Sequence, residues 1–230
     1  MKKNILAIGG GGFGRSSSSY LIEKYLLNLS NKDCPEICFL PTATGDDNSY
    51  IVRFYSVFSR LNCKPSHIEF FKRTPDIRSH IMKQDIIFVG GGNTKSLLAI
   101  WNDWGMSELL YEAYNEGIIM SGVSAGAICW FKSGITDSWD NELRILPCLD
   151  FISGTCCPHY DEEPSRIPFV KKILLEKKVS NCLSIEGGAA IHFIDGKPYK
   201  NVCFLNNKNS YNVYLDNNEI VESPFENIQL

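Results

Sequence analysis

A short apolar strand that runs directly into a Gly-x-Ser-x-Gly turn constrains the fold of this chain most. Residues 117–121 read Gly-Ile-Ile-Met-Ser, and Gly122-Val123-Ser124-Ala125-Gly126 follows, before small residues suited to a helix start. Such a strand–turn–helix unit exposes the serine hydroxyl on a tight turn, toward which the helix start directs free N–H groups. We therefore predict Ser124 as a nucleophile, and a purely structural turn is the alternative.

Strand and helix patterns alternate along the first two-thirds of the chain. Four apolar runs predict buried strands: residues 3–8, 38–40, 67–71 and 85–89. Helical patterns fall between them and before Ser124: residues 20–29, 51–58, 95–101 and 107–116. Strands separated by helices indicate right-handed βαβ units. The fold class expected is therefore α/β, with a mostly parallel sheet covered by helices on both faces.

The pattern changes beyond Pro147. A helix is expected over residues 167–178 and a strand over 182–185, and two apolar runs then flank Asp195-Gly196-Lys197, which is a hairpin signal. This part predicts C-terminal antiparallel strands added to the edge of the sheet. Because no repeat, linker or change of composition interrupts the chain, we expect a single domain over residues 1–230.

Composition excludes several classes of protein. The net charge is −3 and 44% of the 230 residues are hydrophobic, so no basic surface indicates binding to nucleic acid or to an anionic membrane. No apolar run is long enough to span a membrane, and the N-terminus lacks a signal-peptide pattern. Nine cysteines without C-x-x-C spacing and four histidines without ligand spacing favour free thiols and no metal site. A cytoplasmic protein is expected.

Two glycine-rich loops follow predicted strands. Gly9, Gly11 and Gly14 match the dinucleotide-binding pattern G-x-G-x-x-G, but the acidic residue expected after the second strand is missing. We therefore expect a close-packed turn and no cofactor, and a nucleotide-binding module stays as an alternative function. In the second loop, the amides of Gly91 and Gly92 would lie beside Ser124 if their strands are neighbours.

The second loop therefore predicts an oxyanion hole. The Gly91 or Gly92 amide would form it together with the amide of Ala125. Asn93, the next residue, is expected either to cap the following helix or to contact the substrate.

A serine nucleophile needs a base and a group that orients the base. His159 is the candidate base because it lies in a loop after Pro158, whereas His192 lies in an apolar strand and is expected to be structural. Glu186 and Asp137 are the candidate orienting acids, and a solvated surface carboxylate is the alternative for each.

These motifs together resemble the peptidase E (α-aspartyl dipeptidase) family of serine peptidases, relatives of cyanophycinase. The resemblance rests on Gly90-Gly91-Gly92-Asn93-Thr94, Gly122 to Ala127, Ile135-Thr136-Asp137, Pro158-His159 and Glu186-Gly187, in this order. It implies a flavodoxin-like three-layer sandwich of the class I glutamine amidotransferase-like type. It also implies Ser124 as nucleophile and His159 as general base. The family pattern has been assigned a third member at positions matching Glu186 and Asp137, and we prefer Glu186 because a strand end can aim it rigidly.

The resemblance implies a substrate class. We expect a serine peptidase that hydrolyses short peptides, as a dipeptidase or aminopeptidase-like enzyme, and that acts as a monomer or homodimer. Arg166 is the arginine near the His159 loop that would bind an aspartyl side chain, although its neighbours Asp161, Glu162 and Glu163 are acidic. That acidic loop would equally attract a substrate's amino group. Another serine hydrolase, such as an esterase, is the alternative enzyme.

Overall fold

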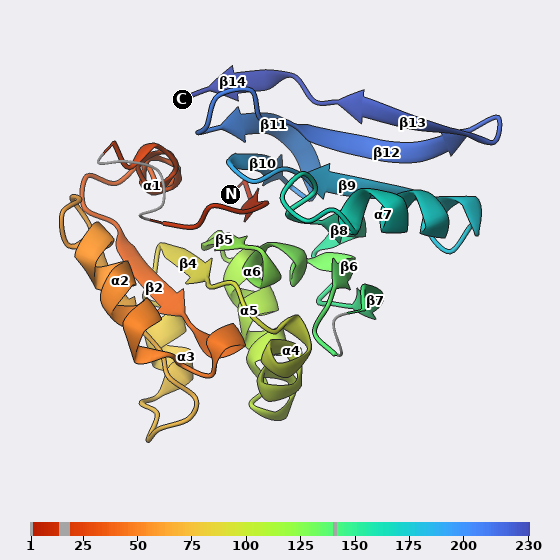
Figure 1. The fold of residues 1–230 in the computed structure, drawn as a ribbon. Coiled ribbons are helices and arrows are strands. Elements are labelled where there is room, and N and C mark those ends of the chain that lie inside the picture. The colour runs from red at the N-terminus through yellow and green to blue at the C-terminus, as the bar shows by residue number, and fades with distance from the viewer. Residues whose placement is uncertain (1, 14–18, 140–141) are drawn as a thin grey trace.

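The computed structural model describes residues 2–13, 19–139 and 142–230, whose strands form two sheets (Figure 1). The first sheet has the order β14 (Asn227–Gln229), β11 (Lys197–Cys203), β10 (Ala189–Ile194), β1 (Asn4–Ile8), β5 (Ile119–Val123), β4 (Ile86–Val89), β2 (Glu36–Leu40) and β3 (Lys64–His67). The second has the order β13 (Glu219–Pro224), β12 (Ser210–Asp216), β9 (Asn181–Ile185), β8 (Ile152–Cys157), β6 (Phe131–Thr136) and β7 (Arg144–Pro147).

The first sheet contains the parallel core that the sequence predicts. Strands β1, β5, β4, β2 and β3 pair with their neighbours in parallel. The hairpin predicted around Asp195-Gly196-Lys197 is β10 and β11, and β10 pairs with β1 in antiparallel orientation. The prediction of antiparallel strands at the edge of the parallel sheet is therefore confirmed for this hairpin.

The second sheet differs from the expectation of one sheet. Strand β6 pairs in parallel with β8, and β8 with β9, while β7, β12 and β13 add antiparallel pairs at the edges. Phe131, Ile152 and Leu183 bury one face of this sheet in the same core as β1 and β5. The other face packs against α7 (Arg166–Leu175) through Val170 and Ile173. These strands bury apolar residues on both faces, one against the first sheet and one against α7. They therefore form a sheet of their own and do not extend the edge of the first one.

Helices cover both faces of the first sheet. Along β1, Leu6 and Ile8 pack with α1 (Leu21–Asn28) and α2 (Asn48–Phe58), whereas Ile5 and Ala7 belong to the core on the other face. That other face carries α3 (Ile77–Ile81), α4 (Thr94–Asp103), α5 (Met106–Asn115) and α6 (Ala125–Ile128). Alternate residues of a strand point to opposite faces, so this burial pattern follows directly from the strand geometry.

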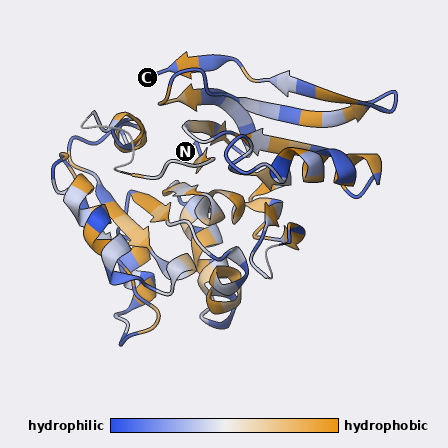
Figure 2. Ribbon diagram, viewed as in Figure 1, coloured by the Kyte–Doolittle hydropathy of each residue, from blue (hydrophilic) through white to orange (hydrophobic). Residues whose placement is uncertain are grey.

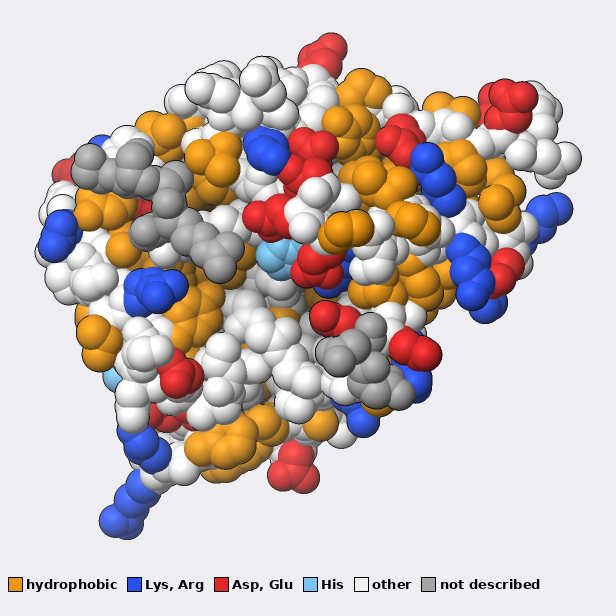
Figure 3. Space-filling model, viewed as in Figure 1, with side chains coloured by type: hydrophobic (Ala, Val, Ile, Leu, Met, Phe, Trp, Pro, Cys, Tyr) orange, Lys and Arg blue, Asp and Glu red, His pale blue; other side chains and the backbone are white. Residues whose placement is uncertain are grey.

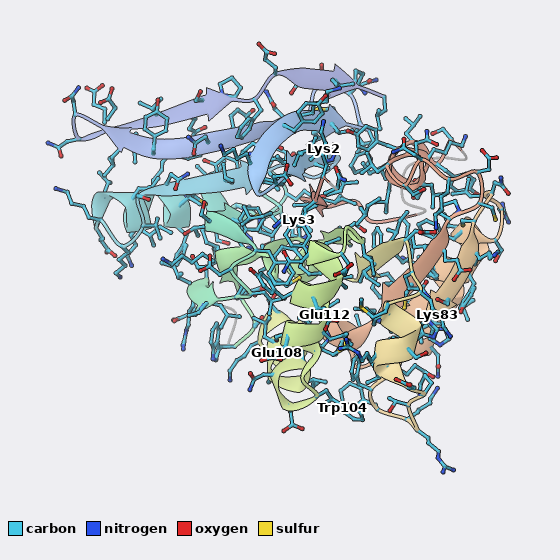
Figure 4. All side chains as sticks on the ribbon, turned by 180° about the vertical axis from the view of Figure 1, so that it is seen from behind. Lys2, Lys3, Lys83, Trp104, Glu108 and Glu112 are labelled. Atoms are coloured by element: carbon cyan, nitrogen blue, oxygen red, sulfur yellow. The ribbon has the colours of Figure 1, made fainter. Side chains whose placement is uncertain are left out.

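The outer sides of the helices are polar. Figure 2 shows hydrophobic residues concentrated on the strands and on the inner sides of the helices. From behind, Glu108 and Glu112 are visible on α5 (Figure 4), and Glu112 accepts a hydrogen bond of 2.8 Å from Arg78. Leu109 and Leu110 on the same helix are buried. Among the described residues, no helix combines the length and apolarity that crossing a membrane requires.

The third strand is displaced from its predicted position. We expected it over residues 67–71, but β3 ends at His67. Ile68 and Phe70 are buried beyond the strand, where the Asp46 carboxylate accepts the backbone N–H groups of Phe70 and Phe71. The apolar residues in this run therefore bury a loop, which sequence periodicity does not distinguish from a strand.

Candidate active site

Ser124 lies where β5 turns into α6, as the strand–turn–helix pattern predicts. Its backbone has φ 56° and ψ −114°, and its N–H donates a 3.0 Å hydrogen bond to the carbonyl of Ile8. A Cβ atom on Gly126 would collide with the carbonyl of Val89 on the neighbouring strand. The turn is therefore held in a sparsely populated conformation by its close packing against β1 and β4.

His159 follows β8 and lies against Ser124. The distance between His159 Nε2 and Ser124 Oγ is 2.8 Å, which is a hydrogen bond. The backbone of His159 has φ 53°, and its N–H donates to the carbonyl of Gly9 at 3.2 Å. The His159 side chain is 18% exposed, and its ring packs against Gly10 of the first glycine loop and bonds Ser124, so these two contacts hold it in place.

The carboxylate on the other nitrogen of His159 belongs to Glu162. Glu162 Oε2 contacts His159 Nδ1, three residues away in the same turn, where the Glu162 N–H also donates to the His159 carbonyl at 3.1 Å. This arrangement favours the tautomer with the proton on Nδ1, so that Nε2 accepts the hydroxyl proton of Ser124. Ser124, His159 and Glu162 thus form a continuous hydrogen-bonded series.

The structure does not bring Glu186 or Asp137 to His159. Glu186 follows β9, and its Oε2 accepts the N–H of Asn209 at 2.8 Å. Asp137 Oδ1 lies 3.9 Å from a guanidinium nitrogen of Arg166, and its side chain is 55% exposed. The strand end does hold Glu186 firmly, but it directs the carboxylate toward the loop before β12 rather than toward the imidazole.

Two of the three predicted oxyanion donors, Gly91 and Ala125, lie next to Ser124. Gly91 packs against the Ser124 side chain, and its N–H donates to the hydroxyl of Tyr50 at 3.2 Å. Ala125 is the first residue of α6, so its N–H has no partner within the helix. Gly92 packs against the turn at Ala43. The amides of Ala125 and Gly91 are therefore the better placed pair.

Asn93 and Arg166 make structural contacts. Asn93 Oδ1 caps α4 by accepting the N–H of Ser96 at 2.9 Å, and its Nδ2 donates to the carbonyl of Ser138 at 2.9 Å. The Arg166 side chain is 4% exposed and donates to Glu163 at 2.7 Å and to the Ile135 carbonyl at 2.8 Å. Neither residue lines the pocket beside Ser124.

A pocket of about 370 Å³ opens over Ser124 and His159. Near the middle of the face in Figure 3, a histidine is visible in a hollow beside several acidic side chains. The described residues that line the pocket come from the glycine loop, from α2 with its preceding turn, from the ends of β4 and β5, and from the loop after β8: Gly11, Gly12, Phe13, Thr44, Asp47, Ser49, Tyr50, Arg53, Gly91, Val123, Ser124 and His159. Sequence reasoning missed the α2 residues, although their three-residue spacing is visible in the sequence.

Asp161, two residues after His159, anchors the loop through an ion pair and a hydrogen bond. Asp161 accepts the N–H of Gly187 at 2.8 Å and pairs with the ammonium group of Lys208. Burial by itself would raise the pKa of Asp161, but these hydrogen bonds outweigh it and hold the pKa below its ordinary value. Asp161 is thus charged at neutral pH and ties the loop to the segments around Gly187 and Lys208.

The glycine loop after β1 packs against this site. Gly10 forms a bridge with Gly187, and a Cβ atom on Gly10 would collide with Glu162 and with the His159 ring. Its glycines therefore have a use other than holding a pyrophosphate, while Gly14, the last glycine of the pattern, lies outside the described residues. Among the described residues, no three His, Cys, Asp or Glu side chains are grouped so that they would hold a metal ion.

A serine–histidine–carboxylate series at the end of a parallel strand is the arrangement of a serine hydrolase. Residues 5–200 match the model of Peptidase family S51, and the chain belongs to this family of serine peptidases. The resemblance to peptidase E and cyanophycinase is thereby confirmed. A curated relative, the uncharacterized peptidase YgaJ of Bacillus subtilis (strain 168), is 43% identical over 223 residues, which cover 96% of each chain.

Solved structures show the same fold at low sequence identity. A peptidase from an acI-B1 Actinobacterium matches with a TM-score of 0.70 and 18% identity, over 96% of this chain and 97% of that one. A putative peptidase E protein from Listeria monocytogenes EGD-e matches with a TM-score of 0.60 and 17% identity, over 98% and 100%. The α/β fold with mixed, mostly parallel sheets is therefore that of peptidase E-like structures.

Proposed function

We propose that this S51 peptidase hydrolyses short peptides, as a dipeptidase or aminopeptidase-like enzyme, with Ser124 as nucleophile and His159 as general base. The observation that carries the proposal is the 2.8 Å hydrogen bond between Ser124 Oγ and His159 Nε2, with the Glu162 carboxylate on His159 Nδ1. Glu162 takes the orienting role for which the sequence favoured Glu186.

The reaction follows from these contacts. Ser124 Oγ attacks the scissile carbonyl carbon while its proton passes to His159 Nε2, and Glu162 stabilises the imidazolium. The negative charge on the carbonyl oxygen faces the N–H groups of Ala125 and Gly91, with Gly92 as the third candidate donor. His159 then gives its proton to the leaving amine, and water releases the acyl group from Ser124 by the same steps.

The Gly91 N–H already donates to the Tyr50 hydroxyl, which affects how it can bind the oxyanion. A substrate oxygen that takes the Gly91 amide would replace the Tyr50 hydroxyl as its acceptor. Fixed donors cost no reorganisation at the moment of reaction, so the Ala125 amide at the start of α6 carries the larger part of the stabilisation.

A dipeptide library tests the proposal. The wild-type protein should hydrolyse a subset of the dipeptides, and Ser124→Ala should lose this activity while circular dichroism and thermal unfolding show an intact fold. Short-chain esters are assayed in parallel, since a strong preference for esters would favour an esterase. Hydrolysis retained by Ser124→Ala at the wild-type rate would overturn the proposal.

A further inference from the structure

One wall of the pocket carries fixed charges of both signs. Asp47 caps α2, and Tyr50 and Arg53 follow at intervals of three residues, so the three lie along one side of the helix. Phe54 and Val57 bury the side that faces the sheet. The charged side of α2 is therefore directed toward the same space as Ser124.

Arg53 has no ionic partner of its own in the described part of the chain. Its side chain is exposed, and no carboxylate of the described residues lies within ion-pairing distance of it, whereas Arg78 and Arg166 pair with Glu112 and Glu163. A guanidinium is always charged at physiological pH and offers two parallel N–H groups to a carboxylate. An arginine in this setting fits a ligand that brings its own carboxylate.

Asp47 supplies the opposite charge in the same pocket. The hydrogen bond from the Ser49 hydroxyl, followed by that from the Tyr50 N–H at 2.9 Å, holds the pKa of Asp47 below its ordinary value. Asp47 and Arg53 are six residues apart, which corresponds to about 9 Å along the helix axis. The pocket therefore presents a negative and a positive group at a fixed separation.

We propose that the pocket selects zwitterionic dipeptides, and that Arg53 is the specificity-determining residue that binds their C-terminal carboxylate. The inference rests on the proposed function. An extended chain spans up to about 3.6 Å per residue, so the end groups of a dipeptide lie about 7 Å apart, and the long Arg53 side chain covers the difference. A volume of about 370 Å³ suits a ligand of this size.

The rest of the lining fits the same ligand. The rings of Phe13 and Tyr50 stack at 5.2 Å between their centroids and form an apolar wall beside the charged groups. With the carboxylate on Arg53, the scissile carbonyl lies between the two ends of the ligand, where Ser124 and His159 line the pocket. The leaving product is then a free amino acid.

Four peptides separate the possible sources of a carboxylate: Ala-Leu, Asp-Leu and the C-terminal amide of each. Arg53→Gln should lower kcat/KM at least tenfold for both free acids and leave both amides unchanged. Arg53→Lys should lower kcat/KM by a smaller factor, since lysine keeps the positive charge but lacks the two parallel N–H groups of the guanidinium. Arg60→Gln is the matched control, because Arg60 contacts the Tyr20 hydroxyl at 3.4 Å and does not line the pocket.

Two outcomes would overturn the inference. If Arg53→Gln loses kcat/KM only on the two Asp peptides, whatever their C-terminus, Arg53 binds an acidic side chain. If kcat/KM equals that of the wild type on all four peptides, Arg53 binds no carboxylate. Calorimetric binding of the four peptides to Ser124→Ala, with and without Arg53→Gln, gives the same answer without turnover. Binding of the free acids that depends on Arg53, without hydrolysis by the wild type, would sink the proposed function and leave this inference standing.

Discussion

The regions around His159 and His192 place the same type of side chain in opposite environments, one beside a carboxylate and one buried among neutral groups. His159 lies in a loop at positive φ, between the Ser124 hydroxyl and the Glu162 carboxylate. His192 lies within β10, is 3% exposed, and bonds the neutral groups Tyr25 at 2.9 Å and Asn4 at 3.0 Å. The sequence predicts a structural role for His192, and these contacts are those of a buried structural residue.

The difference lies in the partners. The carboxylate beside His159 stabilises a positive charge on the ring, which a general base acquires in each catalytic cycle. Burial first, and the charge of Lys200 second, lower the pKa of His192 to about 4, so its ring stays neutral. A histidine thus becomes a candidate base through the groups around it, and the following predictions test this contrast.

The largest effect should come from removing the pair at the site. Ser124→Ala or His159→Gln should lower kcat by about 10⁴-fold or more, because nucleophile and base act as a unit. His192→Gln is the matched control and should keep kcat within a few-fold. The rates are measured on a dipeptide that the library identifies as a substrate. Equal losses of kcat in His159→Gln and His192→Gln would contradict the different roles of the two histidines.

The orienting carboxylate should have the next largest effect. Glu162→Gln should lower kcat by about 10²- to 10⁴-fold, since an amide does not stabilise the imidazolium. Glu186→Gln should cost less than tenfold, because Glu186 bonds Asn209 and not the ring. The reverse order of the two variants would assign the orienting role to Glu186.

A smaller effect is expected from filling the space at Gly10. A methyl group there would collide with Glu162 and His159, so Gly10→Ala should displace both and lower kcat about 10- to 100-fold. Gly105→Ala is the control for backbone strain without collision: space is open around its Cβ position but its φ is 66°, so this variant should lose some stability and keep its kcat. Thermal unfolding separates a displaced site from a damaged fold, and unchanged kcat in Gly10→Ala would contradict the packing.

The smallest effect concerns stability alone. Because the pKa of His192 is lower in the folded protein than its ordinary 6.5, the unfolded chain takes up the proton first as the pH falls. The free energy of unfolding should therefore drop by about 3 kcal/mol between roughly pH 6.5 and pH 4. Urea unfolding at both pH values measures it.

Two variants sharpen this last prediction. His192→Gln should remove that part of the pH dependence, whereas Tyr25→Phe should lower the stability at both pH values and keep the dependence. An unchanged pH dependence in His192→Gln would show that other groups cause it. Neither variant should alter the chemical step, since both residues lie away from the pocket lining.

By itself, the sequence determined the features that depend on short-range pattern. Apolar periodicity located four of the five parallel strands of the first sheet and most helices, and glycine, serine and small residues predicted the turn at Ser124. Five short motifs in a fixed order between residues 90 and 187 were enough to indicate the family. These features are readable because period, turn chemistry and spacing act over a few residues.

Only the tertiary structure decided which groups meet. Glu186, at a strand end, is directed toward Asn209, while Glu162, in an acidic run, lies on the His159 ring. Arg166 is buried against Glu163, whereas Arg53, on a helix about 70 residues before Ser124, lines the pocket. A second sheet also formed where one was expected. Side-chain direction and the packing of distant segments set these contacts, and both depend on the whole folded chain.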